Sequence, residues 1–394
     1  MAPLPITAIA LASALGNGTG AATQAMRQGR SGLRRNDFLD SALDTWIGRV
    51  PGLEDAPLGG GLAHFDCRSN RLALLGLQQD GFEAAVVRAA ARHGARRVAV
   101  YIGTSSSGIL EAELAFRHRD PATGALPAAL RFSDTYNLYS VASFVQQRLG
   151  LHGPCCTVSA ACASSAKAFA AAQRAIAAGL CDAAVVGGVE TLCFTTLQGF
   201  AALELLSSQP WRPFDAERNG ISIGEAAAFA LLEKDAPGGA TLALLGYGES
   251  ADAFHMSTPH PQGLGATRAM RDALQLAGLS PGDVDYLNLH GTGTRNNDAA
   301  ENAAVCAVFG ERLACSATKG WTGHTLGAAG AVEAVLTLLA LRDGFLPGTA
   351  NTRRTDPQFG IRLALETVPQ PLRHTMSNSF GFGGSNCSLV FGRV

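Results

Sequence analysis

The sequence predicts an α/β protein with largely buried sheets, and three observations support this. Short apolar runs alternate along the chain with longer, Ala-rich runs that have helical spacing. Hydrophobic residues make up 47% of the 394 residues and charged residues only 16%, which supplies a large buried core. The 46 glycines indicate many tight turns and close backbone approaches. This composition excludes a disordered or low-complexity protein.

The expected elements follow one another regularly along the chain. A first strand and turn are expected within Ile6–Gly16, where a short β-type run begins. Further strands are predicted at Arg97–Ile102, Cys155–Val158, Ala183–Val186, Ala227–Leu232, Ala243–Tyr247, Tyr286–Leu289 and Ser388–Phe391. Helices are predicted at Arg71–His93, Ala163–Ala178, Gly265–Ala277, Ala299–Phe309 and Ala328–Arg342. The Pro/Gly segment Asp235–Ala240 is the best internal break, so we expect a boundary between residues 1–238 and residues 239–394.

Charge, cysteine content and hydropathy limit the class of protein. Lys and Arg number 31 against 32 Asp and Glu, so no basic field indicates a nucleic-acid partner. The nine cysteines, an odd number, fit a reducing compartment, and Cys155 and Cys156 are interpreted as core residues of a strand. The apolar segment Ile6–Gly16 lacks the preceding basic residues of a signal peptide, and no run of 18 apolar residues predicts a membrane span. We therefore expect a cytoplasmic protein.

The segment Thr157–Ser165 holds the first candidate for chemistry. A strand that ends near Val158 leads through very small residues into a helix that extends to Ala178. Cys162 then lies at or near the helix N-terminus, where unpaired N–H groups favour a thiolate and lower the thiol pKa. The small neighbours leave room for a substrate at the sulfur. The alternative interpretation is a small buried core cysteine.

Two histidine loops and one isolated carboxylate are further candidates. His290 enters a Gly/Thr loop directly after an apolar strand, and His324 closes the polar loop that starts at Lys319. Neither histidine has metal-ligand spacing, so we expect no metal site. Taken alone, each histidine is more often a satisfied structural residue than a catalyst. Glu333 is the only charged residue of Ala328–Leu341 and needs a partner if it is buried, for which Lys319 is a candidate. The alternative is that Glu333 faces solvent.

The Gly-rich segment Asn378–Asn386 precedes the last predicted strand. It lacks the GK[ST] sequence of a phosphate loop, and a strand rather than a helix follows it. Glycines interleaved with aromatic residues favour a flexible loop that lines an apolar pocket and whose amides stabilise an oxyanion. An ordinary tight turn is the alternative.

Together these motifs resemble those of the elongating β-ketoacyl-acyl-carrier-protein synthases, the condensing enzymes of fatty acid and polyketide synthesis. The matching motifs are VSAACASS around Cys162, RPFDAERNGISIGE from Arg212 to Glu225, HGTGT at His290, KGWTGHTLGAAG at His324, and NSFGFGGSN. The resemblance implies a thiolase-like five-layer αβαβα sandwich built from two similar halves. Residues 1–238 would carry the nucleophilic cysteine and residues 239–394 the two catalytic histidines.

The resemblance also implies roles for individual residues. Cys162, His290 and His324 match the catalytic triad, which Lys319 and Glu333 would support. Other matched positions are the gating Phe380, whose N–H would complete the oxyanion hole with that of Cys162, and the pantetheine-binding Thr292 and Thr294. The implied reaction is a decarboxylative Claisen condensation of an acyl-Cys162 intermediate with malonyl-carrier protein. It would need no cofactor beyond the phosphopantetheine arm of the carrier.

The partners implied are an acidic acyl carrier protein and a second synthase subunit. Arg68, Arg71 and Arg212 match carrier-contacting positions, although an ordinary solvated face is the alternative. A homodimer is expected, and a heterodimer with a chain-length-factor-like subunit of secondary metabolism is the second possibility. The retained Cys162 argues against a non-catalytic chain length factor. The chain departs from the family at Arg295–Asn297, where Pro is common, which leaves the substrate class open.

Overall fold

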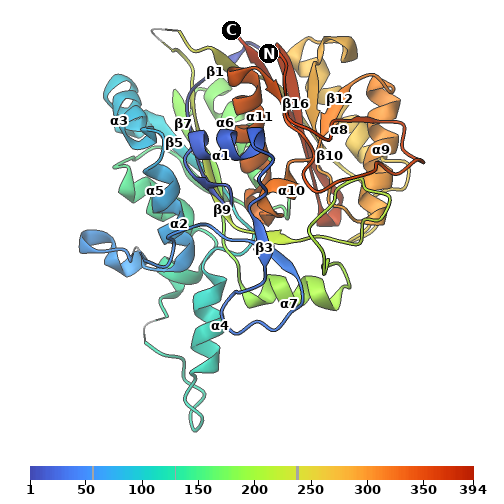
Figure 1. Cartoon of the computed structure of the whole chain (residues 1–394). Coiled ribbons are helices and arrows are strands. Elements are labelled where there is room, and N and C mark those ends of the chain that lie inside the picture. Colours follow the sequence, from blue (N-terminus) through green and yellow to red (C-terminus); the bar gives the residue numbers. More distant parts are fainter. Residues whose placement is uncertain (56, 129, 237–238) are drawn as a thin grey trace.

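The computed structural model describes residues 1–55, 57–128, 130–236 and 239–394. The predicted boundary between residues 238 and 239 falls on a residue outside these ranges. Figure 1 shows a central α/β body in which the two chain termini lie at the same end. No helix in the described ranges is both long enough and apolar enough to cross a membrane.

The two halves of the chain contain sheets of the same topology. In the first half the strands lie in the order β6-β5-β7-β9-β1. Their bounds are β1 Leu4–Ser13, β5 Val98–Gly103, β6 Cys155–Val158, β7 Ala183–Glu190 and β9 Ala226–Glu233. β5 pairs in parallel with both β6 and β7, whereas β9 is antiparallel to β7 and to β1.

The second half repeats this order as β12-β11-β16-β17-β10. The bounds are β10 Leu242–Ala251, β11 Tyr286–Asn288, β12 Ala314–Ser316, β16 His374–Gly381 and β17 Ser385–Arg393. β11 is parallel to β12 and β16, and β17 is antiparallel to β16 and β10, so each strand has a counterpart in the first half. The halves meet where β1 pairs with β10 at Leu4 and Leu244.

Five layers follow from the helices that cover these sheets. Two central helices, α6 (Ser164–Ala177) and α11 (Ala329–Asp343), share one apolar core with strands of both halves. The outer faces are covered by α2, α3 and α5 on the first sheet and by α8 and α9 on the second. Their bounds are α2 Arg68–Leu77, α3 Phe82–His93, α5 Ser140–Arg148, α8 Leu264–Ala277 and α9 Arg295–Phe309. The predicted αβαβα sandwich is thereby confirmed.

Helix α11 is buried on every side. All its residues from Ala329 to Leu341 are buried, as expected for a helix whose surface is apolar all round. Glu333 therefore does not face solvent, and the solvated alternative considered for it is wrong. The remaining α-helices and strands are β2 Gly16–Asn17, α1 Thr19–Arg27, β3 Leu33–Arg35, β4 Trp46–Gly48, α4 Ile109–Arg117, α7 Phe194–Ala202, β8 Ile223–Gly224, α10 Lys319–Thr322, β13 Phe345–Leu346, β14 Arg362–Leu363 and β15 Val368–Pro369.

Three details differ from the sequence predictions. The single helix expected over Arg71–His93 is divided into α2 and α3, because Asp80 and Gly81 have left-handed backbone angles, with φ of 55° and 69°. The expected Gly-rich loop begins as a strand, since β16 extends to Gly381 and only three residues turn the chain into β17. Cys156 is exposed rather than in the core, because β6 is an edge strand.

Candidate active site

Cys162 lies in a strained turn between β6 and α6. The preceding residue, Ala161, has a φ of 49°, a left-handed conformation that non-glycine residues rarely adopt. The hydroxyl of Ser164 stabilises this turn, because its Oγ accepts the Ala160 N–H at 2.8 Å and donates to the Ala161 carbonyl at 2.5 Å. The turn directs Cys162 away from the helix toward the second half of the chain.

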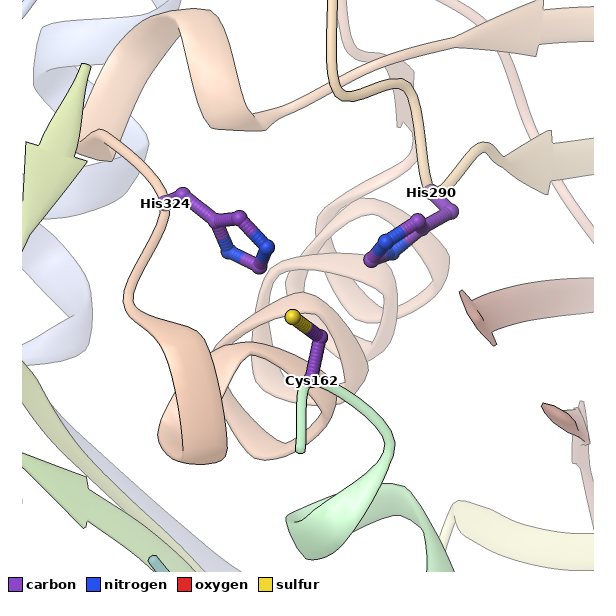
Figure 2. Close-up of side chains that lie close together, drawn as sticks. All are labelled: Cys162, His290 and His324. Carbon is purple, nitrogen blue, oxygen red and sulfur yellow. The ribbon is translucent and has the colours of Figure 1, made fainter. Parts of the chain in front are cut away.

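The two histidines converge on this sulfur from the other half. His290 follows β11, and His324 follows the short helix α10. The Cys162 Sγ and one ring nitrogen from each histidine all lie within 4.8 Å of one another. The two imidazole planes are nearly perpendicular, with an interplanar angle of 76° and ring centroids 5.5 Å apart. Figure 2 shows both rings directed at the thiol.

Hydrogen bonds at Nδ1 determine the tautomer of both imidazoles. The Lys319 ammonium, which can only donate, lies 3.1 Å from Nδ1 of His290. The Leu326 N–H donates to Nδ1 of His324 at 3.3 Å. Burial lowers the pKa of both imidazoles well below the usual value, and the Lys319 charge lowers it further, so both rings are neutral. A neutral ring that accepts at Nδ1 carries its proton on Nε2, and each histidine is therefore an N–H donor.

The resting form of Cys162 is a thiol, which corrects the expected lowering of its pKa. Burial raises the pKa of this thiol to about 12, and the charges of Glu333 and Glu190 add to the rise. The Lys319 ammonium and the N–H of Phe382 favour the thiolate but do not outweigh burial. Helix α6 begins two residues later, at Ser164, so Cys162 precedes the helix rather than belonging to its first turn.

The backbone amide at the sulfur belongs to Phe382 and not to the predicted Phe380. Phe380 lies within β16 opposite Asn386, with its buried ring 5.8 Å from that of His290. Phe382 follows the strand, and its backbone N–H favours the Cys162 thiolate and so lowers the pKa of that thiol. The ring of Phe382 contacts that of Phe200, with ring centroids 5.8 Å apart. Its side chain is 38% exposed. The two glycines that follow Phe382 could have indicated this role from the sequence. They predict a turn after the strand, and backbone N–H groups in such a turn are not paired within the sheet.

Lys319 and Glu333 form the buried pair that the sequence suggested. Lys319 is 1% exposed and Glu333 2%, and the ammonium contacts Oε1 of the carboxylate. Lys319 also donates to the His290 carbonyl at 2.5 Å. Burial raises the pKa of Glu333, whereas the Lys319 charge opposes that rise. The contact with Glu333 thus holds the Lys319 ammonium beside Nδ1 of His290.

A cavity of about 600 Å³ connects the buried triad with the surface. Cys162, His290 and His324 line its inner part, and the exposed Leu203 and Arg295 line its rim. Between them lie Thr292 and Thr294, half-buried, with their hydroxyl oxygens 2.8 Å apart. The cavity is mixed in character, because its lining contains both aromatic rings and hydroxyl groups.

Comparison with known proteins gives the family. Residues 1–237 match the family described as beta-ketoacyl synthase, N-terminal domain, and residues 242–353 match its C-terminal domain. The chain belongs to the beta-ketoacyl synthase family. A 3-oxoacyl-(acyl-carrier-protein) synthase 2 of Mycobacterium bovis is 43% identical over 248 residues, covering 59% of this chain and 60% of that relative. A mitochondrial 3-oxoacyl-(acyl-carrier-protein) synthase of Arabidopsis thaliana is 40% identical over 270 residues, covering 64% of this chain and 59% of that one. The matched region thus spans about 60% of the length of these relatives.

Solved structures of ketosynthases match over the whole chain. A ketosynthase, ApeO, in complex with its chain length factor, ApeC, from Xenorhabdus doucetiae superimposes with a TM-score of 0.90 at 38% identity. That match covers 100% of this chain and 98% of the other. The ishigamide ketosynthase/chain length factor also gives a TM-score of 0.90, at 28% identity, and covers 100% and 99% of the two chains.

Two buried carboxylates near His290 were not predicted from the sequence. Glu301 accepts the N–H groups of His290 at 2.7 Å and of Gly291 at 2.8 Å. Asp298 accepts the Gly293 N–H at 3.0 Å and the Phe214 N–H at 2.8 Å. Burial raises the pKa of Glu301 to about 7 and that of Asp298 to about 6. Their place in the first turns of α9, just after the HGTGT motif, is the signal that could have found them.

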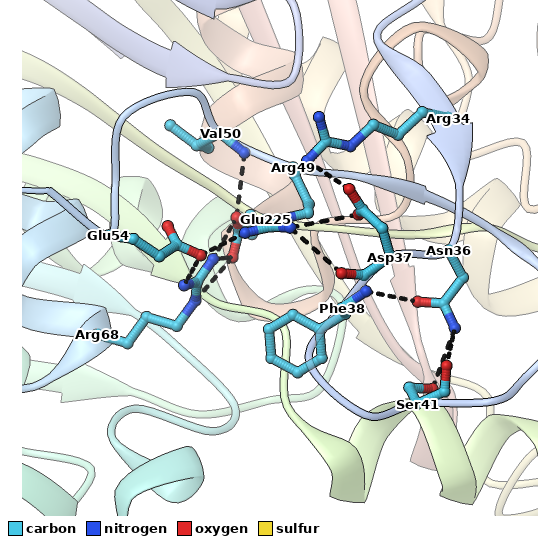
Figure 3. A network of polar contacts seen from close by, with 10 residues as sticks. All are labelled: Arg34, Asn36, Asp37, Phe38, Ser41, Arg49, Val50, Glu54, Arg68 and Glu225. Atoms are coloured by element: carbon cyan, nitrogen blue, oxygen red, sulfur yellow. Dashed lines mark hydrogen bonds and ion pairs between the residues drawn. The ribbon is translucent and has the colours of Figure 1, made fainter.

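The expected basic surface patch does not form as predicted. Arg68 is buried, and its guanidinium donates to both oxygens of the buried Glu225 and to Glu54 (Figure 3). Its positive charge is neutralised inside the protein, so the prediction that Arg68 contacts a carrier protein is wrong. Arg71 is half-buried and makes two 2.6 Å bonds to Asp66.

Arg212 is also half-buried, and its guanidinium is hydrogen-bonded within the protein. Its guanidinium donates to Gln209 at 2.6 Å and to the Glu217 carbonyl at 3.0 Å. Surface contact with a carrier at Arg71 and Arg212 remains a prediction, and it would have to compete with these internal bonds.

The triad atoms also have a spacing that one transition-metal ion could bridge. The Lys319 ammonium beside His290 opposes a second positive charge at this place. The absence of a metal thus remains a prediction, which the electrostatics of the site favours.

Proposed function

We propose that the chain catalyses decarboxylative condensation of an acyl group on Cys162 with a malonyl thioester, giving a 3-oxoacyl thioester. The observation that carries the proposal is the arrangement of one thiol and two neutral imidazoles, each with an Nε2–H, at the base of a cavity. Family membership and the names of the curated relatives agree with it. No cofactor is proposed beyond the phosphopantetheine arm of an acyl carrier protein.

In the first half-reaction the acyl group moves from the carrier to Cys162. The sulfur attacks the thioester carbonyl, the bond to the carrier sulfur breaks, and the proton of Cys162 ends on the departing carrier thiol. Because the resting thiol has a raised pKa, the charge that forms on sulfur needs nearby donors. The Phe382 N–H and the two imidazole N–H groups supply them.

In the second half-reaction the malonyl group loses carbon dioxide. The electron pair of the broken bond forms an enolate, and the negative charge rests on the thioester oxygen. Nε2–H donors of His290 and His324 stabilise that oxygen at the buried inner end of the cavity. The enolate carbon then attacks the acyl carbonyl, the bond to Cys162 breaks, and the sulfur regains a proton from solvent.

Partner and pathway belong to the same proposal. Two of the ketosynthases that match this chain over its whole length occur with a chain length factor. This favours, as a second form of the proposal, a catalytic subunit that pairs with a chain-length-factor-like chain in secondary metabolism; the alternative is a homodimer. We place the enzyme in the cytoplasm, where its cysteines, all free in this structure, would remain reduced.

Mass analysis of Cys162 adducts tests the proposal. Wild type and Cys162→Ala are incubated with a panel of acyl-carrier proteins, with and without a candidate partner chain. The wild type should gain the mass of the acyl group on the peptide that contains Cys162, and the variant should not. A wild type that stays unmodified with every carrier and partner would refute the proposed activity.

A further inference from the structure

Glu190, the last residue of β7, joins separate segments of the chain through one buried carboxylate. Its side chain is completely buried. Oε2 accepts the Ser105 N–H at 2.7 Å, the Ser105 hydroxyl at 2.6 Å and the Gly327 N–H at 2.9 Å. Oε1 accepts the Ser106 N–H at 2.8 Å and also the Ser106 hydroxyl. All these donors are neutral, so the carboxylate acts as a junction of hydrogen bonds.

These bonds cross from one half of the protein to the other. Glu190 and the two serines lie at the ends of the neighbouring parallel strands β7 and β5 in the first half. Gly327 belongs to the second half and lies three residues after His324, in the 3-10 turn Leu326–Ala328 that precedes α11. The Leu326 N–H, one residue earlier, is the donor to Nδ1 of His324. The bond from Gly327 to Glu190 therefore fixes the same short segment that sets the tautomer of His324.

The contact is so close that it requires glycine at position 327. A Cβ atom at this position would lie 2.4 Å from Glu190 Oε2 and 2.5 Å from the Ser105 nitrogen. Real Cβ contacts are essentially never shorter than 3.0 Å, and the Ser105 nitrogen is backbone, which cannot move aside as a flexible side chain can. The backbone of the His324 segment is thus seated directly on the carboxylate.

We propose that Glu190 is a positioning residue that holds the His324 segment of the second half against the strand ends of the first half, where Cys162 lies. The inference rests on the proposed function, because it concerns the alignment of two groups of the condensation. It adds to that function a residue that none of the matched motifs contains.

Besides positioning the His324 segment, Glu190 acts on Cys162 through its negative charge. Replacing Glu190 should therefore slow condensation through the loss of positioning and favour acylation through the loss of charge. The negative charge contributes to the raised pKa of the Cys162 thiol. Glu190→Gln removes this charge, which favours the thiolate and Cys162 acylation. The same variant replaces one acceptor oxygen by an N–H₂ donor, so one group of N–H donors loses its partner. A merely structural role would change both half-reactions in the same direction.

The test measures the two half-reactions separately in wild type, Glu190→Gln and a matched control. Acylation of Cys162 is followed by intact mass with acyl-carrier protein. The acylated enzyme is then freed of excess carrier and mixed with malonyl-carrier protein, and condensation is followed in a single turnover. The control is Glu233→Gln, because Glu233 is equally a buried carboxylate at the end of a strand, but bonds to Thr7, Arg92 and His93.

For Glu190→Gln we expect condensation to slow by about 10- to 100-fold, since small misplacements of reacting groups have effects of that size. Acylation should be unchanged or faster, and the pH midpoint for iodoacetamide alkylation of Cys162 should fall. Glu233→Gln should change none of these quantities. Equal slowing of both half-reactions, or no change in either, would overturn the proposal.

A second variant answers the question if Glu190→Gln does not fold. Gly327→Ala keeps the charge of Glu190 but forces the His324 segment away from it. It should slow condensation and leave the alkylation midpoint of Cys162 unchanged; unchanged condensation would refute the positioning role. A wild type inactive in both half-reactions would instead refute the proposed function.

Discussion

The two catalytic histidines are held in place by different parts of the molecule. The segment of His290 is bonded to Glu301, which lies eleven residues later in the same half. The segment of His324 is bonded to Glu190, which belongs to the other half. In both cases a buried carboxylate accepts backbone N–H groups. The alignment of His290 is therefore a local property of the second half, whereas that of His324 depends on how the two halves are joined.

The largest expected effect comes from removing one imidazole. His324→Ala should lower decarboxylation of malonyl-carrier protein by about 10²- to 10³-fold, the usual loss for one oxyanion donor. Acylation of Cys162 should survive, because its sulfur, the Phe382 N–H and the Nε2–H of His290 remain. Release of carbon dioxide and intact mass measure the two steps. Lost acylation with preserved decarboxylation would reverse the role given to His324.

A smaller effect is expected when the local support of His290 is weakened. Glu301→Gln leaves one of two N–H groups without an acceptor, and single-turnover condensation should slow by about 10-fold, as is common for residues that orient a functional side chain. In the double variant Glu301→Gln/Glu190→Gln, the increases in activation free energy of the two single variants should add to within about 0.5 kcal/mol, because the two carboxylates hold different segments. Strong non-additivity would show that the two histidines are not positioned independently.

The smallest effect concerns stability as a function of pH. Burial raises the pKa of Glu301 to about 7 and of Asp298 to about 6 in the folded protein, above their ordinary values of 4.5 and 3.8. Between those values the folded state binds more protons than the unfolded state, so the free energy of unfolding should fall as pH rises through this window. Glu301→Gln should reduce the slope, measured by urea unfolding at several pH values. An unchanged slope would contradict the assigned cause.

The sequence was sufficient where a residue type and its motif determined the chemistry. Cys162, His290 and His324 stand in motifs with characteristic neighbours, and the lone charge of Glu333 in an apolar helix required a partner such as Lys319. The alternation of strands and helices predicted the α/β class. The duplicated topology of the two halves could not be predicted from sequence periodicity, because two segments of different sequence can fold with the same strand order.

The errors arose where the outcome depended on packing. The pKa of Cys162 is raised because burial outweighs the local dipoles, and burial cannot be read from neighbours in the chain. Arg68 was expected at the surface, but its partner Glu225 lies 157 residues away. Glu190 and Glu301 were missed because their partners are backbone N–H groups, which every sequence contains.

The central claim is that one thiol and two neutral imidazoles carry out the condensation. A single-turnover experiment tests it most directly: acyl-Cys162 enzyme is mixed with malonyl-carrier protein, and the mass of the Cys162 peptide is followed together with the 3-oxoacyl product. The account predicts that the acyl mass disappears from Cys162 at the rate at which the product forms, in wild type but not in His324→Ala. Product formed while the acyl group remains on Cys162 would contradict it.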